Sequence, residues 1–308
     1  MITQRLIDEL RDLGVSYRTN VSLAPYTWYK LGGPAEIFSE PDSIETLSHL
    51  LATCHRQNIE VRVLGSGANL LVRDSGVPGV VIYLSNPVFK SHGPLDTSNG
   101  LVSVGAGYDL MRLVRETAAA GLAGIEGLAG VPASIGGAIR MNAGGAYGQI
   151  ADAVHTVTVM NEHGQTRTLQ GSDIPFAYRH SGIAEPLILS AELALKPEDP
   201  LKLRERVKTV FAEKKQSQPF ADVSAGCAFR NPVDESGTPI DSAGRLIDQC
   251  GLKGHRVGGA VVSDVHANFM VAEDQATADD LLGLIESVEI AVEKQTGIAL
   301  RRELVVWP

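Results

Sequence analysis

The chain has 308 residues, of which 44% are hydrophobic and 20% charged, and its formal net charge at pH 7 is −9. This length can build two domains with a substantial core, and the composition is that of an ordinary globular protein. The negative charge argues against a nucleic-acid binder that neutralises many phosphates, so an anionic ligand would need a local cluster of Lys and Arg. The three cysteines form no C-x-x-C pair, which predicts neither a zinc site nor a disulfide framework.

The first part of the chain predicts helices that alternate with short strands. Residues 3–13 form an amphipathic helix whose many charges exclude a secretory signal, and no apolar run reaches membrane-spanning length, so we expect a cytosolic, reducing setting. Asp42 is the expected N-cap of a second helix, with Glu45 completing a capping box. The other elements expected here are strands at 61–64, 70–72, 79–84 and 101–104, and a helix at 108–120.

Most of the second part predicts strands, followed by a separate C-terminal region. The Pro- and acid-rich residues 197–200 mark a boundary, and a helix at about 201–215 follows it. The order of elements is α+β, without a regular βαβ alternation. The expected elements are strands at 153–160, 165–169 and 187–195, a capped helix near 277–295 and a last strand at 304–307.

Residues 121–148 carry nine glycines interleaved with apolar residues. Glycine loses the most conformational entropy on folding, so this density indicates positive φ angles or a close approach of the main chain to something. One interpretation is a buried wall on which a large flat ligand lies. The other is a set of tight turns between short strands, and the pattern alone leaves both open.

The segment 64–69, LGSGAN, follows a predicted strand and could bring phosphate oxygens to main-chain N–H groups. A Rossmann fingerprint would need a third glycine where Leu70 stands, and the strand continues from there, so a Rossmann helix is not expected. A strand–turn–strand site for pyrophosphate, with Ser66 and Asn69 as side-chain donors, and an ordinary turn both remain open. The sequence has no Walker A motif and no H-E-x-x-H pair, so we expect no P-loop enzyme and no metal site.

Three further clusters could carry chemistry. Cys227 lies between small residues in SAGCAFRNP (224–232), where it could be a proton donor, a nucleophile or a small buried hydrophobe; Cys54 and Cys250 are expected to be the latter. Arg179 in YRHSG offers a planar fork for a carboxylate or phosphate, or it is a surface arginine at a turn. Residues 253–256 and 266–269 combine cations, an amide and an aromatic ring, which suits a nucleotide or an ordinary polar loop.

Taken in this order, the segments resemble the UDP-N-acetylenolpyruvoylglucosamine reductase family, in its shorter class. The resemblance covers nearly the whole chain, through LGSGANLLVRD (64–74), GLAGVPASIGGAIRMNAGGAYG (127–148), YRHSG (178–182), SAGCAFRNP (224–232) and the LRRE segment (300–303). It implies an FAD-dependent oxidoreductase, UDP-N-acetylmuramate dehydrogenase, which uses NADPH to reduce UDP-N-acetylglucosamine enolpyruvate for peptidoglycan synthesis. FAD would be noncovalent, because residues 64–69 contain no histidine to attach it.

The resemblance also implies a fold and its division into domains. The fold would be α+β, with an FAD-binding domain of the PCMH/vanillyl-alcohol-oxidase-like type at 1–198, divided into subdomains at about 1–88 and 89–198. A smaller substrate-binding domain would span 199–298, and a C-terminal strand at 299–308 would carry Glu303 back to the active site. We expect a cytoplasmic protein, a monomer, whose partner is the small-molecule substrate and neither nucleic acid nor a membrane.

The family's catalytic trio falls on Arg179, Cys227 and Glu303, for charge stabilisation, protonation and positioning of the substrate carboxylate. Ser is commoner than Cys at position 227, and a thiol is the stronger acid. The implied FAD contacts are Leu31, Gly32, Gly33, Leu64, Gly65, Ser66, Gly67, Ala68, Asn69, Leu70, Gly127, Gly130, Val131, Pro132, Ala133, Ser134, Gly136, Gly137, Ala138, Asn142 and Gly144. The substrate contacts are Tyr178, Arg179, Lys215, Gln218, Gly226, Cys227, Lys253, Arg256 and Asn268, with Lys214 as a further candidate.

Two other functions remain possible from the sequence. An oxidase of the same FAD-binding architecture would consume oxygen with an alcohol donor and would be indifferent to NADPH. A flavin-binding protein without enzymatic activity would have no use for Arg179, Cys227 and Glu303, and it would tolerate Cys227→Ala.

Overall fold

The computed structural model describes residues 4–234 and 240–308, which fall into two compact units. Unit 1 comprises Met1–Val21, Ala35–Ser66 and Pro78–Lys214, and unit 2 comprises Ser22–Pro34, Gly67–Val77 and Lys215–Pro308. Each unit is therefore assembled from segments that are far apart in the sequence. The predicted domains, with borders near residues 88, 198 and 298, are instead continuous stretches of the chain. They describe FAD and substrate binding, and they stay a prediction.

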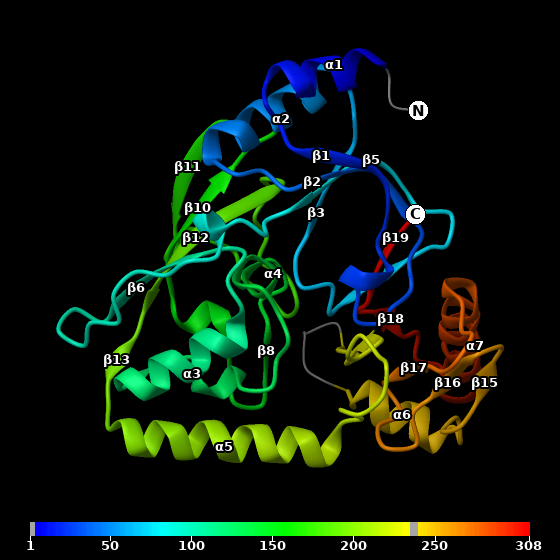
Figure 1. The fold of residues 1–308 in the computed structure, drawn as a ribbon. Helices are drawn as coiled ribbons and strands as arrows, with labels where there is room; N and C mark the ends of the chain where they lie inside the picture. Colours follow the sequence, from blue (N-terminus) through cyan, green and yellow to red (C-terminus); the bar gives the residue numbers. More distant parts are fainter. Residues whose placement is uncertain (1–3, 235–239) are drawn as a thin grey trace. The chain divides into compact units, whose positions relative to one another are not determined.

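The N-terminal part of unit 1 is a four-stranded sheet with two helices. The strand order is β1-β2-β5-β3, and β3 and β5 run parallel. Its elements are α1 (Gln4–Asp12), β1 (Tyr17–Ser22), β2 (Pro34–Ser39), α2 (Ile44–Arg56), β3 (Val61–Leu64) and β5 (Val77–Tyr83) (Figure 1).

The beginning of α2 differs from the prediction by one residue. Ser43 is the N-cap, with an extended backbone and a hydroxyl that accepts the N–H of Thr46 at 3.1 Å. Asp42, the predicted cap, instead accepts a hydrogen bond from the Thr46 hydroxyl at 2.9 Å. Asp42 and Ser43 are both residue types that favour the N-cap. Ser43 is the cap because its oxygen accepts the third helical N–H.

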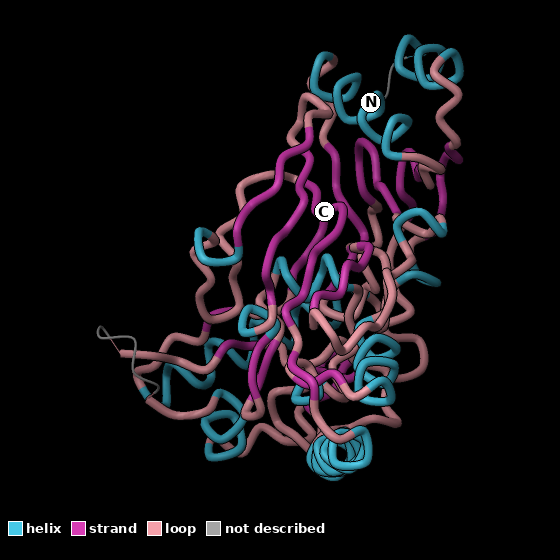
Figure 2. The backbone as a smooth tube through the Cα atoms, turned by 90° about the vertical axis from the view of Figure 1, so that its left-hand side faces the viewer, coloured by secondary structure: helices cyan, strands magenta, loops and turns pink. Residues whose placement is uncertain are grey.

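A second, antiparallel sheet with the order β11-β10-β12-β6 forms the rest of the framework of unit 1 (Figures 1 and 2). Its strands are β6 (Leu101–Gly105), β10 (Val154–Met160), β11 (Thr166–Gln170) and β12 (Leu187–Ala194). Helix α3 (Leu110–Ala120) begins at the Asp109 cap and ends at Gly121 in the left-handed conformation. One hydrophobic cluster extends through both sheets and α1–α4, so unit 1 has a continuous core.

The glycine-rich segment has little regular structure of its own. It contains β7 (Leu122–Ala123), a 3-10 turn at Glu126–Leu128, the short helix α4 (Ile135–Arg140), and the hairpin of β8 (Gly144–Gly145) and β9 (Gly148–Gln149). Strand β7 pairs with β13 (Lys196–Pro197), after which α5 (Pro200–Ser217) begins.

Unit 2 is held together by short strands from four parts of the chain. Strand β4 (Leu70–Val72) runs parallel to β19 (Val305–Trp307), and β14 (Phe229–Arg230) is antiparallel to β18 (Arg301–Arg302). Helix α7 (Ala278–Thr296), with a Thr277–Asp280 capping box, packs its apolar side into the core with α6 (Ala243–Gln249). A meander of β15 (Arg256–Val257), β16 (Ala260–Val262) and β17 (Met270–Ala272) completes it.

The strands of that meander and α6 were not predicted, because elements of two to seven residues carry too little periodicity to stand out. None of the helices in the described parts of the chain combines the length and apolarity that crossing a membrane requires.

Candidate active site

Close packing between protein segments accounts for many of the glycines in the 121–148 segment. A Cβ on Gly127 would overlap the carbonyl oxygen of Tyr147, one on Gly144 would lie 2.6 Å from the Cβ of Gln149, and one on Gly136 would lie 3.0 Å from the Cβ of Ala106. For these residues the turn interpretation is sufficient, since no larger side chain fits.

Two of the predicted FAD segments come together within unit 1. A Cβ on Gly65 would lie 2.8 Å from the hydroxyl of Ser134, and that hydroxyl caps α4 by accepting the N–H of Gly137 at 3.2 Å. The N–H groups of Ile135 and Gly136 donate to the main chain of residues 106–108, at 2.9 and 2.8 Å. The beginning of α4 is thus bonded to the main chain of residues 106–108, and the turn after β3 packs closely against its cap, Ser134.

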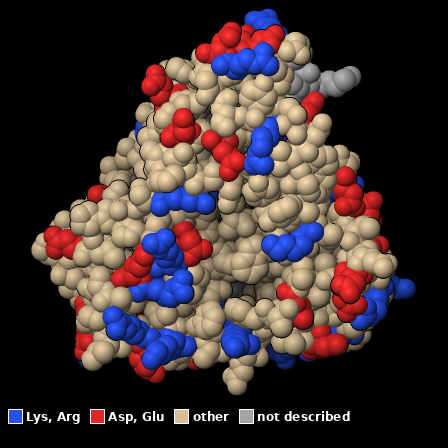
Figure 3. All heavy atoms as spheres, in the orientation of Figure 1, with Lys and Arg blue, Asp and Glu red and all other residues tan. Residues whose placement is uncertain are grey.

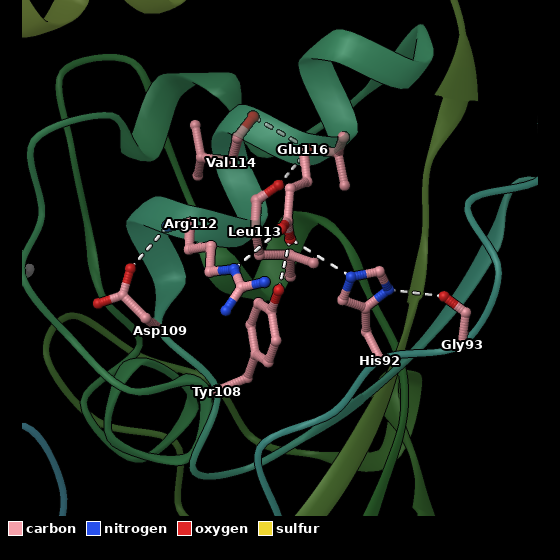
Figure 4. Close-up of polar contacts among 9 residues, drawn as sticks. His92, Gly93, Tyr108, Asp109, Arg112, Leu113, Val114 and Glu116 are labelled. Atoms are coloured by element: carbon pink, nitrogen blue, oxygen red, sulfur yellow. Dashed lines mark hydrogen bonds and ion pairs between the residues drawn. The ribbon is translucent and has the colours of Figure 1, made fainter. Parts of the chain in front are cut away.

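A polar network holds the loop at residues 106–109 in place (Figure 4). The Glu116 carboxylate accepts hydrogen bonds from the Tyr108 hydroxyl at 2.5 Å and from Nε of Arg112 at 2.9 Å, and the His92 ring lies 3.3 Å away. The other ring nitrogen of His92 lies 2.6 Å from the Gly93 carbonyl. Burial, together with Glu116, raises the pKa of Tyr108 to about 12, so its hydroxyl remains a donor at neutral pH.

Arg179 is anchored to the glycine segment of unit 1. It occupies a turn in which Ala177 and His180 exchange two main-chain hydrogen bonds, and its φ is +57°. This conformation is uncommon for a residue with a side chain, and here the turn enforces it. The guanidinium donates to the carbonyl of Gly144 at 2.9 Å, and the amide of Asn142 donates to the carbonyl of Ala177 at 3.1 Å. The predicted residues Arg179, Asn142 and Gly144 are therefore in one structural group.

Lys214 joins this group from α5. Its ammonium donates to the carbonyl of Ala129 at 2.7 Å, and its Cδ would lie 3.0 Å from a Cβ on Gly130. Burial lowers the pKa of Lys214 to about 8, and the positive charge of Arg179 acts in the same direction. The neighbouring Lys215 is exposed, so of the two lysines it is Lys214 that the structure places on the glycine segment.

Cys227 and Glu303 flank the paired strands β14 and β18 of unit 2, two residues before β14 and directly after β18. The N–H of Glu303 donates to the carbonyl of Ala228 at 2.8 Å, and Cys227 itself pairs with Phe269 on its other side. Gly226 has a φ of +77°, and nothing lies within 4 Å of a Cβ placed on it. The main chain therefore brings Cys227 and Glu303 close together, with open space at Gly226, the residue before Cys227. Arg179, the third member of the predicted trio, belongs to unit 1.

Asn268, a predicted substrate contact, bonds to the main chain of unit 2 in this structure. Its side chain is 2% exposed, and both ends of its amide are used by one residue: it accepts the N–H of Phe229 at 2.9 Å and donates to the carbonyl of Phe229 at 2.8 Å. Asn268 thus fixes the strand that carries Cys227.

Two of the predicted cations are committed to carboxylates. Lys253 pairs with Asp248 at 3.0 Å, and Arg256 forms a two-pronged pair with Glu273. Gln218 is half-buried at the end of α5.

The turn that follows β3 fits a phosphate-bearing cofactor. Gly67 has a φ of +66°, and the structure gives no acceptor, among the residues it describes, to the N–H groups of Gly67, Ala68 and Asn69. Gly67 and Ala68 are buried, and successive unpaired N–H groups in such a turn bind anions. The Asn69 side chain, predicted to reach the ligand, instead donates to the carbonyl of Glu303 at 3.1 Å.

The third predicted FAD segment, residues 31–33, packs within unit 2 against residues 72–76. The N–H of Gly33 donates to the carbonyl of Arg73 at 3.0 Å, and a Cβ on Gly32 would lie 3.0 Å from that of Val72. Here too the glycines serve close packing of main chain.

Comparison with known proteins defines the class and then the family. Residues 35–170 match the model of an FAD binding domain, and residues 218–307 match the C-terminal domain of UDP-N-acetylenolpyruvoylglucosamine reductase. A variant of the berberine bridge enzyme, solved in complex with (S)-reticuline, shares the fold over 64% of this chain and 44% of its own, with a TM-score of 0.50 and 19% identity. The class is therefore that of FAD-dependent oxidoreductases, as predicted, and the FAD-binding part shares its fold with the berberine bridge enzyme.

Individual relatives are similar over almost the whole chain. UDP-N-acetylenolpyruvoylglucosamine reductase of Bradyrhizobium sp. (strain ORS 278) is 38% identical over 92% of this chain and 90% of its own, and that of Moorella thermoacetica is 37% identical over 94% and 92%. The crystal structure of the enzyme from Thermus caldophilus has a TM-score of 0.79 and 39% identity, covering 96% of this chain and 99% of its own. The chain belongs to the UDP-N-acetylenolpyruvoylglucosamine reductase family, which confirms the resemblance and the use of FAD.

Proposed function

We propose that this protein uses NADPH and FAD to reduce UDP-N-acetylglucosamine enolpyruvate to UDP-N-acetylmuramate, a step of peptidoglycan precursor synthesis, with Cys227 as the proton donor. FAD, when bound, supplies hydride transfer from NADPH to the substrate. The residues that would hold it are those of segments 31–33, 64–70 and 127–144. The N–H groups of Gly67, Ala68 and Asn69, which have no acceptor within residues 4–234 and 240–308, support this assignment because they suit the cofactor's diphosphate.

Arg179 is the proposed electrostatic catalyst. The substrate's double bond is conjugated to a carboxylate, so addition of hydride to its terminal carbon places negative charge on the carbon and carboxylate next to it. A guanidinium already fixed in position can stabilise this charge without reorganisation. The hydrogen bond from Arg179 to Gly144 supplies that fixation, and Lys214 adds a second positive charge on the same segment.

Cys227 and Glu303 are proposed to complete the reaction. The Cys227 thiol transfers its proton to the carbon next to the carboxylate, which forms the last C–H bond of the lactyl product and leaves a thiolate that takes a proton from solvent. Glu303 orients the substrate carboxylate. The observation that carries this proposal is the hydrogen bond from the Glu303 N–H to the carbonyl of Ala228, because Ala228 directly follows Cys227 in the chain.

The decisive experiment is anaerobic oxidation of NADPH by the purified protein, with and without the UDP-sugar substrate, together with its visible spectrum. We expect a bound-flavin spectrum and oxidation that depends on substrate. Cys227→Ala should lose turnover by about 10²–10⁴-fold, the range of general acid catalysis, whereas Cys227→Ser and the control Cys250→Ala should retain it. Substrate-independent oxygen consumption with an alcohol would favour an oxidase instead, and normal turnover of Cys227→Ala would remove the thiol from the mechanism.

We also propose that the protein acts as a cytoplasmic monomer. NADPH and a nucleotide sugar are cytoplasmic metabolites, and no disulfide joins its three cysteines. Sedimentation equilibrium on the flavin-loaded protein would return about the chain mass of 32.7 kDa for a monomer and twice that mass for a dimer.

A further inference from the structure

Two arginines face each other across the short ribbon of β14 and β18 in unit 2. The strands are antiparallel, and their register pairs Phe229 with Arg302 and Arg230 with Arg301. Residues directly opposite each other in such a pair lie on the same face, with Cβ atoms about 5 Å apart. Like charges in this position repel and destabilise the ribbon unless something of opposite charge neutralises them.

Among the residues that the structure describes, neither arginine is neutralised by a direct ion pair. Neither Arg230 nor Arg301 has a carboxylate partner there, and the Nε of Arg230 is buried without a hydrogen-bond partner. A buried N–H group without an acceptor costs free energy. Within the described parts of the chain, this ribbon face therefore holds two guanidinium groups without a paired carboxylate, one of which has a buried Nε without an acceptor.

The next arginine along the strand shows the contrast. Arg302, on the opposite face, forms a two-pronged pair with Glu289, with both N–O distances at 2.6 Å. Many other arginines are paired as well, among them Arg206 with Glu198, and acidic and basic side chains are interspersed on the face of the molecule in Figure 3. In a chain with a net charge of −9, these two adjacent arginines, which form no ion pair with a described residue, contrast with Arg302 beside them.

The ribbon also carries the proposed catalytic residues. The N–H of Glu303 donates to Ala228, one step beyond the Phe229–Arg302 pair, so the alternation of the strand puts Glu303 on the face of Arg301 and Arg230. Glu303 is two residues after Arg301, roughly 7 Å along an extended chain. A ligand whose carboxylate is held at Glu303 could therefore extend a second anionic group to the arginine pair.

We propose that Arg230 and Arg301 form a phosphate-binding subsite for a nucleotide reactant of this enzyme. The planar fork of arginine matches phosphate oxygens in a two-pronged geometry, and one phosphate can accept from both side chains. The proposal rests on the proposed function for the identity of the nucleotide. Both reactants carry phosphate: the diphosphate of the UDP-sugar, and the diphosphate and 2′-phosphate of NADPH.

The test uses the FAD-loaded protein and its variants Arg230→Gln, Arg301→Gln and Arg301→Lys, with Arg302→Gln as the matched control. We expect each Gln variant to raise the KM of one nucleotide by about 10-fold or more, as for loss of a charge-assisted hydrogen bond, with kcat changed less than about two-fold. Arg301→Lys should recover part of the loss, because it keeps the charge without the fork. Arg302→Gln should leave both KM values unchanged.

Two binding probes separate the sources of the phosphate and do not depend on turnover. Calorimetric titration with UDP and with adenosine 2′,5′-bisphosphate should show one of the two weakened in Arg301→Gln. Weakened UDP binding assigns the subsite to the sugar nucleotide, and weakened bisphosphate binding assigns it to NADPH.

Unchanged KM values and unchanged binding of both probes in flavin-loaded Arg230→Gln and Arg301→Gln would overturn the subsite. If the wild type binds a probe through these arginines but does not reduce the UDP-sugar, the subsite stands and the proposed function falls.

Discussion

The two units hold their proposed functional side chains in different ways. In unit 1, Arg179 and Lys214 each donate to a main-chain carbonyl of the glycine-rich segment, those of Gly144 and Ala129. In unit 2, Cys227 and Glu303 are placed by main-chain pairing between distant segments. The cations therefore depend on a closely packed local motif, whereas the thiol and the carboxylate depend on the long-range assembly of strands.

The largest expected effect comes from removing the anchored guanidinium of unit 1. Arg179→Ala should lower kcat by about 10²–10³-fold, the loss seen when one preorganised donor to a developing negative charge is removed. The protein should keep its flavin spectrum, because the glycine packing does not depend on this side chain. Stopped-flow measurement of substrate-dependent flavin reoxidation would show the loss directly.

A matched control exists on helix α3 of the same unit. Arg115 is exposed, and Arg115→Ala should behave as the wild type. If Arg179→Ala also kept the kcat of the wild type, Arg179 would have no part in the reaction. Its anchoring to the glycine segment would then serve only the structure of unit 1.

The sequence predicted what depends on local motifs and missed what depends on distant pairing. Helix α7 was predicted to within one residue at each end, and the beginning of α2 differs from the prediction only by Ser43 in place of Asp42 as the cap. The glycine segment was recognised, but composition cannot show how many of its glycines serve close packing between segments of this chain.

The role of Asn268 illustrates what could not be predicted. An amide followed by an aromatic residue in a loop is compatible with ligand binding, and only the fold shows that both its ends are used by Phe229. The charge contrast between Arg301 and Arg302 is equally invisible in the sequence, because it depends on the register of β14 against β18 and on the position of Glu289.

The second prediction tests the long-range assembly of unit 2. Asn268→Ala would leave the N–H and the carbonyl of Phe229 without partners in a buried position, and each orphaned group costs about 1–3 kcal/mol. We expect the free energy of unfolding to fall by about 2–4 kcal/mol, measured by urea denaturation of the flavin-loaded protein.

Two further variants sharpen the result for Asn268. Asn268→Asp keeps the acceptor and loses the donor, so it should lose no more hydrogen bonds than Asn268→Ala does. Near neutral pH its free energy of unfolding should also fall by the cost of a buried charge. Gln216→Ala removes an exposed amide, and its effect should stay within about 0.5 kcal/mol. A value that small for Asn268→Ala would show that unit 2 does not rely on this amide.

The smallest expected effect is a pH dependence that belongs to unit 1 alone. Burial on the glycine segment, with Arg179 nearby, lowers the pKa of Lys214 from 10.5 to about 8. Between these two values the unfolded chain binds a proton that the folded protein does not, so the free energy of unfolding rises with pH across that window. Between pH 8 and 10.5, the free energy of unfolding of the wild type should rise by at most about 3 kcal/mol relative to that of Lys214→Met. The rise should be smaller if solvent screens the half-buried ammonium. Below pH 8 the two should run parallel.

Denaturation curves of the two proteins over this pH range give the difference, in which other titrating groups cancel. Lys208→Met, on an exposed part of the same helix, is the control and should run parallel to the wild type throughout. Because Lys214 loses its charge as pH rises through about 8, the affinity for an anionic reactant should fall in the same range, and Lys214→Arg should abolish that fall. A wild-type curve parallel to that of Lys214→Met would mean that the ammonium is hydrated in solution, and the glycine segment would then hold a single anchored cation, Arg179.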